Sequence, residues 1–210
     1  MLRLLKHIFF PAQKVILQES NPMKKFLIVG LGNIGGQYHN TRHNIGFSIL
    51  DHLANEEKLV FEEAKLGAVA KFSYKGRSIL CLKPSTFMNL SGKAVNYWMQ
   101  QEKIPLDNIL IITDDINLPF GTLRLKGKGS DGGHNGLKDI QNILQTTKYH
   151  RFRFGVGASF SKGRQVEFVL GKWNAEEEQL LKERLKRSTQ LIRSFVFAGA
   201  KNTMNHYNGT

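Results

Sequence analysis

The feature that constrains this chain most is an apolar run, Lys24–Val29, which leads directly into Gly30-Leu31-Gly32-Asn33-Ile34-Gly35. A short apolar run without periodicity predicts a strand that is buried on both faces. The glycines after it predict a turn in which the backbone approaches a neighbour or a ligand closely. Because ligand sites in open α/β sheets form at the carboxyl ends of strands, we expect the functional site to gather around Asn33.

The spacing of these glycines also matches GxGxxG, the fingerprint of dinucleotide-binding folds. That fingerprint requires a helix that opens within the glycines and an acidic residue at the end of a second strand about 20 residues later. Here the polar residues 36–44 follow the glycines, and the acidic residue at that distance, Asp51, lies in a helical pattern. The sequence therefore disfavours NAD binding, and a nucleotide-dependent oxidoreductase is kept only as an alternative hypothesis.

Apolar runs that predict strands alternate with helical patterns along the rest of the chain. Strands are expected at 68–74, 78–82, 108–113, 123–126 and 151–157 (the last with alternating character), and helices from 44, from 91, at 137–144 and from 174. This order predicts a single α/β sandwich. The glycine-rich residues 127–136 predict a mobile loop able to act as a lid. Residues 1–22 are interpreted as a poorly ordered N-terminal extension, which leaves 23–210 as the domain.

Composition excludes several classes of protein. A hydrophobic content of 41% and a charged content of 22% are ordinary for a soluble globular protein. No apolar run approaches the roughly 20 residues that span a bilayer. The single cysteine, Cys81, forms no internal disulfide, lies in an apolar run and is expected to be a small core residue. We therefore expect a cytoplasmic protein without a membrane partner, and a monomer.

Positive charge is concentrated in one quarter of the chain. Of a net charge of +13, residues 121–172 contribute ten Lys and Arg against three Asp and Glu, whereas residues 23–120 hold eleven against nine. A localised basic segment of this kind indicates a polyanionic partner, with nucleic acid as the leading candidate. A solvated, merely soluble surface is the alternative interpretation of the same charges.

Amide, histidine and aspartate side chains follow several of the predicted strands. They are Asn33, His43, Asn89, Asp114 and Asn135. The sequence contains no cysteine pair, HExxH or carboxylate cluster, so a metal site is not expected, and it contains neither GxxxxGK[ST] nor GxSxG. His43 and Asp114 are therefore the best acid–base pair, although an isolated histidine is more often a surface or core residue, and an aspartate at a strand end is often a turn residue.

Five runs in sequence order make the resemblance to a known family plain. They are Gly30–Gly35 with Tyr38–Gly46, Lys83–Gly92, Asp114–Gly121, Gly132–Leu137 and Phe168–Gly171. From residue 23 essentially to the C-terminus, the chain resembles bacterial-type peptidyl-tRNA hydrolases. Ile34 stands where this family usually has proline, and Asn117 where it often has an acid. The fold expected is α/β, a single-domain mixed twisted sheet flanked by helices on both faces.

The resemblance implies hydrolysis of the ester that links a peptide to the 3′ end of tRNA, without metal or cofactor. An ester is reactive enough for a neutral imidazole to suffice as general base on water. His43 would be that base and Asp114 would orient it, as the acid does in a Ser-His-Asp triad. Asn33 and Asn89 would position the substrate or stabilise the oxyanion, and Asn135 would hold the peptide. The sequence leaves open which amide donates to the oxyanion.

The resemblance also assigns contacts with the tRNA acceptor stem and 3′ end. Lys126, Lys128, Arg153 and Lys162 would contact phosphates, which adds affinity without reading sequence. Tyr38 and Met88 would pack against the ester or the terminal base, and His134 is expected to have a structural or supporting role. An RNA-binding homologue that has lost catalysis is the alternative interpretation.

Overall fold

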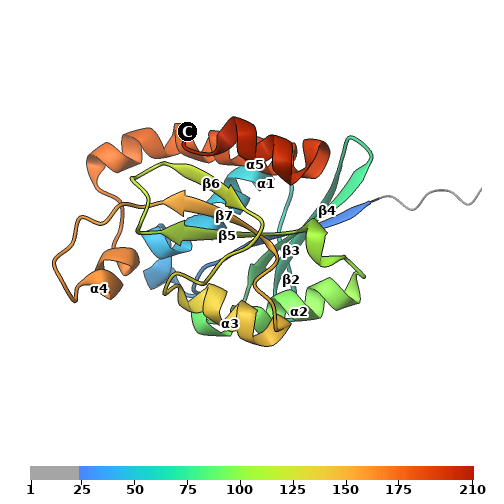
Figure 1. The fold of residues 1–210 in the computed structure, drawn as a ribbon, viewed down its shortest axis with the longest axis horizontal. Helices are drawn as coiled ribbons and strands as arrows, with labels where there is room; N and C mark the ends of the chain where they lie inside the picture. Colours follow the sequence, from blue (N-terminus) through green and yellow to red (C-terminus); the bar gives the residue numbers. More distant parts are fainter. Residues whose placement is uncertain (1–23) are drawn as a thin grey trace, which may run out of the picture.

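The structure, a computed structural model, describes residues 24–210, so the expected N-terminal extension lies outside the described residues. It confirms the α/β class as a mixed seven-stranded sheet with helices on both faces (Figure 1). The strands are β1 (Lys25–Gly30), β2 (Glu62–Ala64), β3 (Gly67–Tyr74), β4 (Arg77–Pro84), β5 (Ile109–Asp115), β6 (Leu123–Lys126) and β7 (His150–Gly155). The α-helices are α1 (Ile45–Glu57), α2 (Ser91–Gln101), α3 (Asn135–Leu144), α4 (Gln165–Leu170) and α5 (Ala175–Tyr207). Short 3₁₀ helices are η1 (Gly36–Tyr38), η2 (Arg42–Asn44), η3 (Met88–Leu90) and η4 (Leu106–Asn108).

The centre of the sheet is parallel and its edges are antiparallel. The strand order is β2-β3-β4-β1-β5-β7-β6, in which β4, β1, β5 and β7 run parallel. The β2–β3–β4 ladder at one edge and the β6–β7 pair at the other are antiparallel. β1 lies between β4 and β5, and its residues 26–30 are all buried, which confirms the prediction of a strand covered on both faces.

Alternate side chains of the central strands supply two separate cores. Phe26 and Ile28 of β1 belong to the core under α1 and α5, whereas Leu27 and Val29 belong to the core under α2 and α3. Figure 1 shows this arrangement, with α1 and α5 on one side of the sheet and α2 and α3 on the other. The carboxyl ends of β4, β1 and β5 consequently open at one edge of the sheet, between the two layers.

Two glycines of the β1–α1 connection allow the strand and the helix to touch backbone to backbone. A Cβ atom on Gly30 would overlap the carbonyl oxygen of Gly46, and one on Gly46 would overlap the backbone of Leu31. A Cβ atom on Gly32 would lie 2.7 Å from the ring of Phe47. Gly30 and Gly32 therefore pack against the first turn of α1, which begins at Ile45, and both face protein atoms rather than a ligand space.

The end of the chain returns to the sheet and covers its outer edge. The α5 helix is kinked at Gly199, whose φ is +83°. Beyond α5, Asn208 accepts from the backbone N–H of Leu125 through Oδ1 (2.6 Å) and donates to the Leu125 carbonyl through Nδ2 (3.1 Å). The backbones of Gly209 and Thr210 also bond to Leu123. The free side of β6 is thus occupied by the last three residues.

Apart from the short 3₁₀ helices, two elements were not expected from the sequence, and one expectation about a strand held only in part. β2 and α4 are additional to the predicted set. The faces of β7 alternate, since Phe152 and Phe154 both lie in the core under α1 and α5, but Arg151 on the other face is buried as well. Arg151 is accommodated by donating to the carbonyls of Ser130 and Thr147, both at 2.7 Å. No helix in the described part of the chain is long and apolar enough to cross a bilayer.

Candidate active site

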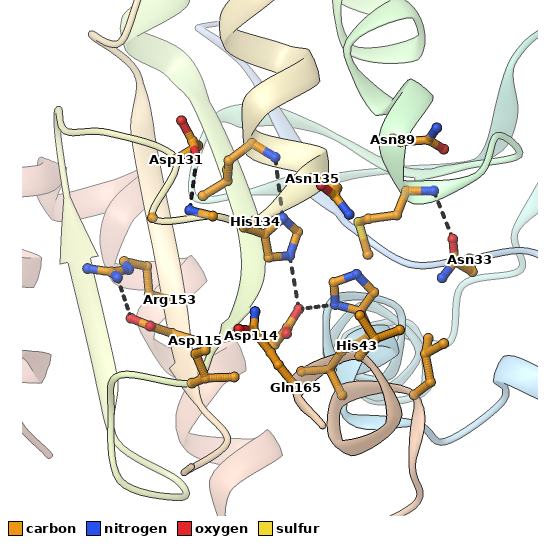
Figure 2. A pocket seen from close by; sticks show the side chains of 18 of the residues that line it. Asn33, His43, Asn89, Asp114, Asp115, Asp131, His134, Asn135, Arg153 and Gln165 are labelled. Atoms are coloured by element: carbon orange, nitrogen blue, oxygen red, sulfur yellow. Dashed lines mark hydrogen bonds and ion pairs between the residues drawn. The ribbon is translucent and has the colours of Figure 1, made fainter. Parts of the chain in front are cut away.

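A cavity of about 430 Å³ lies at the carboxyl ends of the central strands. Seven of the residues predicted for the site line it: Asn33, His43, Met88, Asn89, Asp114, Asn135 and Arg153. They come from the segments after β1 and β4, from β5 and β7, and from the start of α3 (Figure 2). These seven residues therefore share one cavity, although they are separated by as many as 120 positions in the chain.

Asn33 is held in one orientation by the backbone around it. Its Oδ1 accepts from the backbone N–H of Met88 at 2.8 Å, so its NH₂ group is left free to face the cavity. Asn44 fixes the main chain of the same residue, because it accepts from the Asn33 N–H and donates to the Asn33 carbonyl, both at 2.9 Å. In Figure 2 the amide nitrogen of Asn33 lies on the side toward His43. The turn after β1 thus presents a preoriented hydrogen-bond donor.

His43 lies on η2, between this turn and α1, and its ring is bound to the end of β5. Its Nδ1 lies 2.9 Å from Oδ1 of Asp114, which is only 5% exposed. A carboxylate can only accept here, so Nδ1 carries a proton, and in the neutral ring Nε2 keeps its lone pair. Figure 2 shows Nε2 on the side of the ring that faces Asn135. The pair therefore presents a neutral imidazole nitrogen to the cavity.

A second histidine binds the same carboxylate oxygen. Nε2 of His134 lies 3.0 Å from Oδ1 of Asp114, and the two histidine rings have centroids 4.9 Å apart. Nδ1 of His134 accepts from the backbone N–H groups of Gly136 and Leu137, at 3.1 and 3.3 Å. His134 is therefore the N-cap of α3, a place usually taken by Ser, Thr, Asp or Asn. Its ring links the start of α3 to the Asp114 carboxylate.

The two histidines and the carboxylate shift one another's protonation. Burial alone raises the pKa of Asp114, but the positive charge of His43 and the N–H donors of both histidines outweigh it and hold that pKa well below its ordinary range. Burial alone lowers the pKa of His43, yet the charge of Asp114 and its hydrogen bond leave the pKa above the ordinary 6.5. Asp114 is consequently an anion throughout the neutral range and stabilises a positive charge on His43.

The same three side chains have nitrogen and oxygen atoms close enough together for a metal ion. Their hydrogen bonds do not suit one. A histidine that binds a metal normally donates its other ring N–H to an acceptor. In His134 the other nitrogen accepts two backbone N–H groups instead, so Nε2 must carry the proton and has no lone pair to offer. The donor set fits a hydrogen-bonded catalytic group rather than a metal centre.

Arg42, next to His43, anchors the segment that carries the base. Its guanidinium donates to the carbonyl of Lys172 at 2.7 Å and to the carboxylate of Glu177 at 2.7 Å, and it stacks on the ring of Phe168 at 4.3 Å. Arg42 is 7% exposed, and Glu177 also closes the capping box at Asn174, the position from which the sequence predicts this helix. η2 is thereby tied to the junction of α4 and α5.

Of the residues predicted to bind the tRNA, only some approach the cavity. Arg153 lines it and forms an ion pair with Asp115 at 2.7 Å. Three lysines have exposed positions outside the lining: Lys126 at the end of β6, Lys128 in the glycine loop, and Lys162 in the segment before α4. Tyr38 ends η1 and also lies outside the lining, whereas Met88 is 4% exposed and forms part of the wall. Of this set, Arg153 and Met88 therefore line the cavity, and the three lysines and Tyr38 do not.

Several residues of the site were not singled out from the sequence. Asn44 and Arg42 stood in a matched run but had no role of their own, and Asp115 and Gln165 were not proposed. His134 was expected only to support the site. Its position immediately before a helix, with a ring nitrogen where a capping oxygen usually stands, is the signal that identifies it as a cap. Arg42 gave no such signal, because a cation in a turn is ordinarily exposed.

Comparison with known proteins places the chain in a family. The family model described as peptidyl-tRNA hydrolase matches residues 27–210. A peptidyl-tRNA hydrolase from Phocaeicola vulgatus is 58% identical over 184 residues, 88% of this chain and 98% of the relative, and one from Porphyromonas gingivalis is 55% identical with 88% and 100% covered. A crystal structure of peptidyl-tRNA hydrolase from Acinetobacter baumannii is 34% identical, covers 89% of this chain and 95% of that chain, and superposes with a TM-score of 0.82. The chain therefore belongs to the peptidyl-tRNA hydrolase family.

Proposed function

We propose that this chain hydrolyses the ester bond between peptide and tRNA in peptidyl-tRNA, with His43 as the general base on water. Membership of the family supports the substrate and the reaction. The observation that carries the choice of base is the 2.9 Å hydrogen bond from His43 Nδ1 to the buried Asp114. It leaves Nε2 as a free acceptor beside a cavity large enough for an ester and its neighbouring groups.

In the first step, His43 Nε2 removes a proton from a water molecule as the water oxygen attacks the ester carbonyl carbon. The carbonyl π bond breaks and its electrons move to oxygen, which gives a tetrahedral oxyanion and an imidazolium. Asp114, which is held anionic, stabilises that imidazolium across their hydrogen bond. The proton on Nδ1 of His43 stays in its hydrogen bond to Asp114, so the ring keeps one orientation through the step.

Asn33 is the amide that best fits the role of oxyanion donor. Its oxygen is already used by the backbone N–H of Met88, so the group it offers to the cavity is an N–H donor. A donor fixed before the reaction stabilises developing charge without reorganisation, and the removal of one such donor typically lowers kcat by about 10²–10³. Asn89 and Asn135 are exposed at the cavity, and we assign them to the peptide backbone of the substrate.

In the second step, the oxyanion collapses and the bond from carbon to the tRNA oxygen breaks. The imidazolium of His43 gives its Nε2 proton to the departing oxygen, which leaves free tRNA, a peptide carboxylic acid and the neutral base. No covalent enzyme intermediate and no cofactor enters this scheme.

The basic residues beside the cavity supply the contact with tRNA. Lys126, Lys128, Arg153 and Lys162 would bind phosphates of the acceptor stem, with Tyr38 and Met88 against the ester or terminal base. Because Arg153 is paired with Asp115, a phosphate must compete with that carboxylate. We also propose that the enzyme acts as a monomer in the cytoplasm, where its substrate arises, and that residues 23–210 suffice for it.

The experiment that tests this proposal measures release of a labelled N-acylated amino acid from tRNA. Wild type should release it, and His43→Ala should lower kcat by several orders of magnitude while uncharged tRNA binds with an unchanged Kd. Equal rates would remove His43 from the mechanism. Binding of tRNA by wild type without release would favour the alternative, an RNA-binding homologue without catalysis.

A further inference from the structure

We propose that His134 is a positioning residue that limits how strongly Asp114 holds the proton of His43, and so reduces the fraction of the base that is protonated at neutral pH. The inference rests on the proposed role of His43. Its evidence is the sharing of one carboxylate oxygen by two rings, together with the backbone contacts that fix the second ring (Figure 2).

The two hydrogen bonds compete because they end on the same atom. Nδ1 of His43 and Nε2 of His134 approach Oδ1 of Asp114 at 2.9 and 3.0 Å. A donor bound to a carboxylate oxygen withdraws charge from it, and the second donor then finds a weaker acceptor. The N–H of His134 thus reduces the negative potential that Asp114 exerts on the neighbouring ring.

The backbone keeps His134 in the form that can do this. Its Nδ1 accepts the N–H groups of Gly136 and Leu137, so a proton on Nδ1 would face two other protons and uncap α3. Only the neutral ring protonated at Nε2 satisfies all of its contacts. His134 therefore donates to Asp114 through Nε2 and accepts from the backbone through Nδ1, while His43 is the ring that gains and loses a proton during each catalytic cycle.

The competition between the two rings matters because a stronger hydrogen bond to Asp114 alone would favour the protonated, inactive form of His43. Burial and the charge of Asp114 act on the pKa of His43 in opposite directions, and the charge prevails. A general base is most effective when its pKa lies near the working pH, because a more basic group is already protonated. The other ionisable groups around the cavity are Asp115, Asp131 and Arg153, and the guanidinium of Arg42 is directed to α4 and α5. Asp115 and Arg153 pair with each other, which leaves His134 as the neighbour that moderates Asp114.

Two substitutions of His134 separate its two contacts. Asparagine places an oxygen near the position of Nδ1, so His134→Asn keeps the cap of α3 and removes the donor to Asp114. Glutamine places a nitrogen near the position of Nε2, so His134→Gln keeps the donor and removes the cap. His206→Asn, at an exposed position in the last turn of α5, is the matched control for loss of one histidine.

The readout is the protonation of His43 itself, followed by NMR of ¹⁵N-labelled histidine rings, together with the pH profile of kcat/KM. In His134→Asn, the pKa of His43 should rise by roughly half a unit to one unit, and the acid limb of the profile should move upward with it. In His134→Gln, that pKa should stay at the wild-type value while Tm falls because the cap is lost.

The NMR titration does not depend on activity, so it separates this inference from the proposed function. An unchanged His43 pKa in His134→Asn, or an equal shift in both variants, would overturn it and leave a purely structural role. If His134→Asn does not fold, a raised His43 pKa in His134→Gln still contradicts the inference, since that variant keeps the donor to Asp114. Loss of activity in His43→Ala tests the base separately.

Discussion

The charge of Asp114 can be removed while both of its hydrogen bonds are kept. Both histidine rings donate to one oxygen, Oδ1. In Asp114→Asn the amide oxygen can take that place, with the NH₂ group in the position of the other oxygen. In a Ser-His-Asp triad the same substitution reduces kcat by about 10⁴ because the histidine adopts the wrong tautomer. Here the tautomer should survive, so the variant measures the charge alone.

The size of the effect follows from the distance and the burial. Asp114 is 5% exposed, and the charge centres of the carboxylate and the imidazolium are about 4 Å apart. At an effective dielectric constant of about 20, unit charges at that separation attract by about 4 kcal/mol. The imidazolium forms only in the reaction, so kcat should fall by about 10³. Asp114→Ala, which also removes the acceptor, should lose about 10⁴.

The pH profile gives a second and independent expectation. Without the charge of Asp114, burial is the remaining influence on His43 and lowers its pKa below the ordinary 6.5. Since the base acts as the neutral ring, the acid limb of kcat/KM should move to lower pH in Asp114→Asn. The assay is hydrolysis of N-acylated aminoacyl-tRNA across pH 5 to 9, with tRNA binding and Tm as controls for folding. A rate within tenfold of wild type, or equal rates for the two variants, would refute the electrostatic argument.

Three further predictions concern the anchor, the core and the tRNA contact. Arg42→Met should lower the free energy of unfolding by about 3 kcal/mol in urea melts, because it removes a buried guanidinium and leaves the partly buried carboxylate of Glu177 without its cation, whereas Glu177→Gln, which keeps the helix cap, should lose less. Burial raises the pKa of Cys81 to about 12, so its thiol should resist DTNB at pH 8 until the protein unfolds; rapid labelling of native protein would contradict its core position. Changing Lys126 and Lys128 together to Gln should weaken tRNA binding and reduce the slope of log Kd against log salt by about 2, with kcat on bound substrate unchanged; an unaltered slope would place the phosphates elsewhere.

The sequence predicts the centre of this fold well because the signals there are local. The apolar run before Gly30 predicts a buried strand, and the residues from Asn174 predict the start of a helix. Both predictions were confirmed. α4 was missed for the opposite reason. It has only six residues, Gln-Val-Glu-Phe-Val-Leu, which suit a strand as well as a helix, and Arg42 bonds to its last turn. Likewise β2 has two exposed glutamates and exists as the antiparallel partner of β3.

The candidate site was predictable as a set of residues but not as an arrangement. Matched runs brought forward Asn33, His43 and Asp114, and the parallel strands explain why such distant segments meet. The direction of each amide depends on a contact that no pattern announces, such as the Met88 N–H on Asn33. The sequence likewise predicts only a supporting role for His134. What that role is depends on which ring nitrogen accepts from the backbone, and the sequence does not show this.

The hydrogen bonds of residues 208–210 with β6 have a practical consequence for handling the protein. An open edge strand is a template for pairing with another molecule, and here the chain itself fills that place. A purification tag fused after Thr210 would disturb these hydrogen bonds, and a truncation after Tyr207 would expose the edge of β6. Concentrated samples of the shortened chain should then self-associate edge to edge, so an affinity tag belongs at the other terminus.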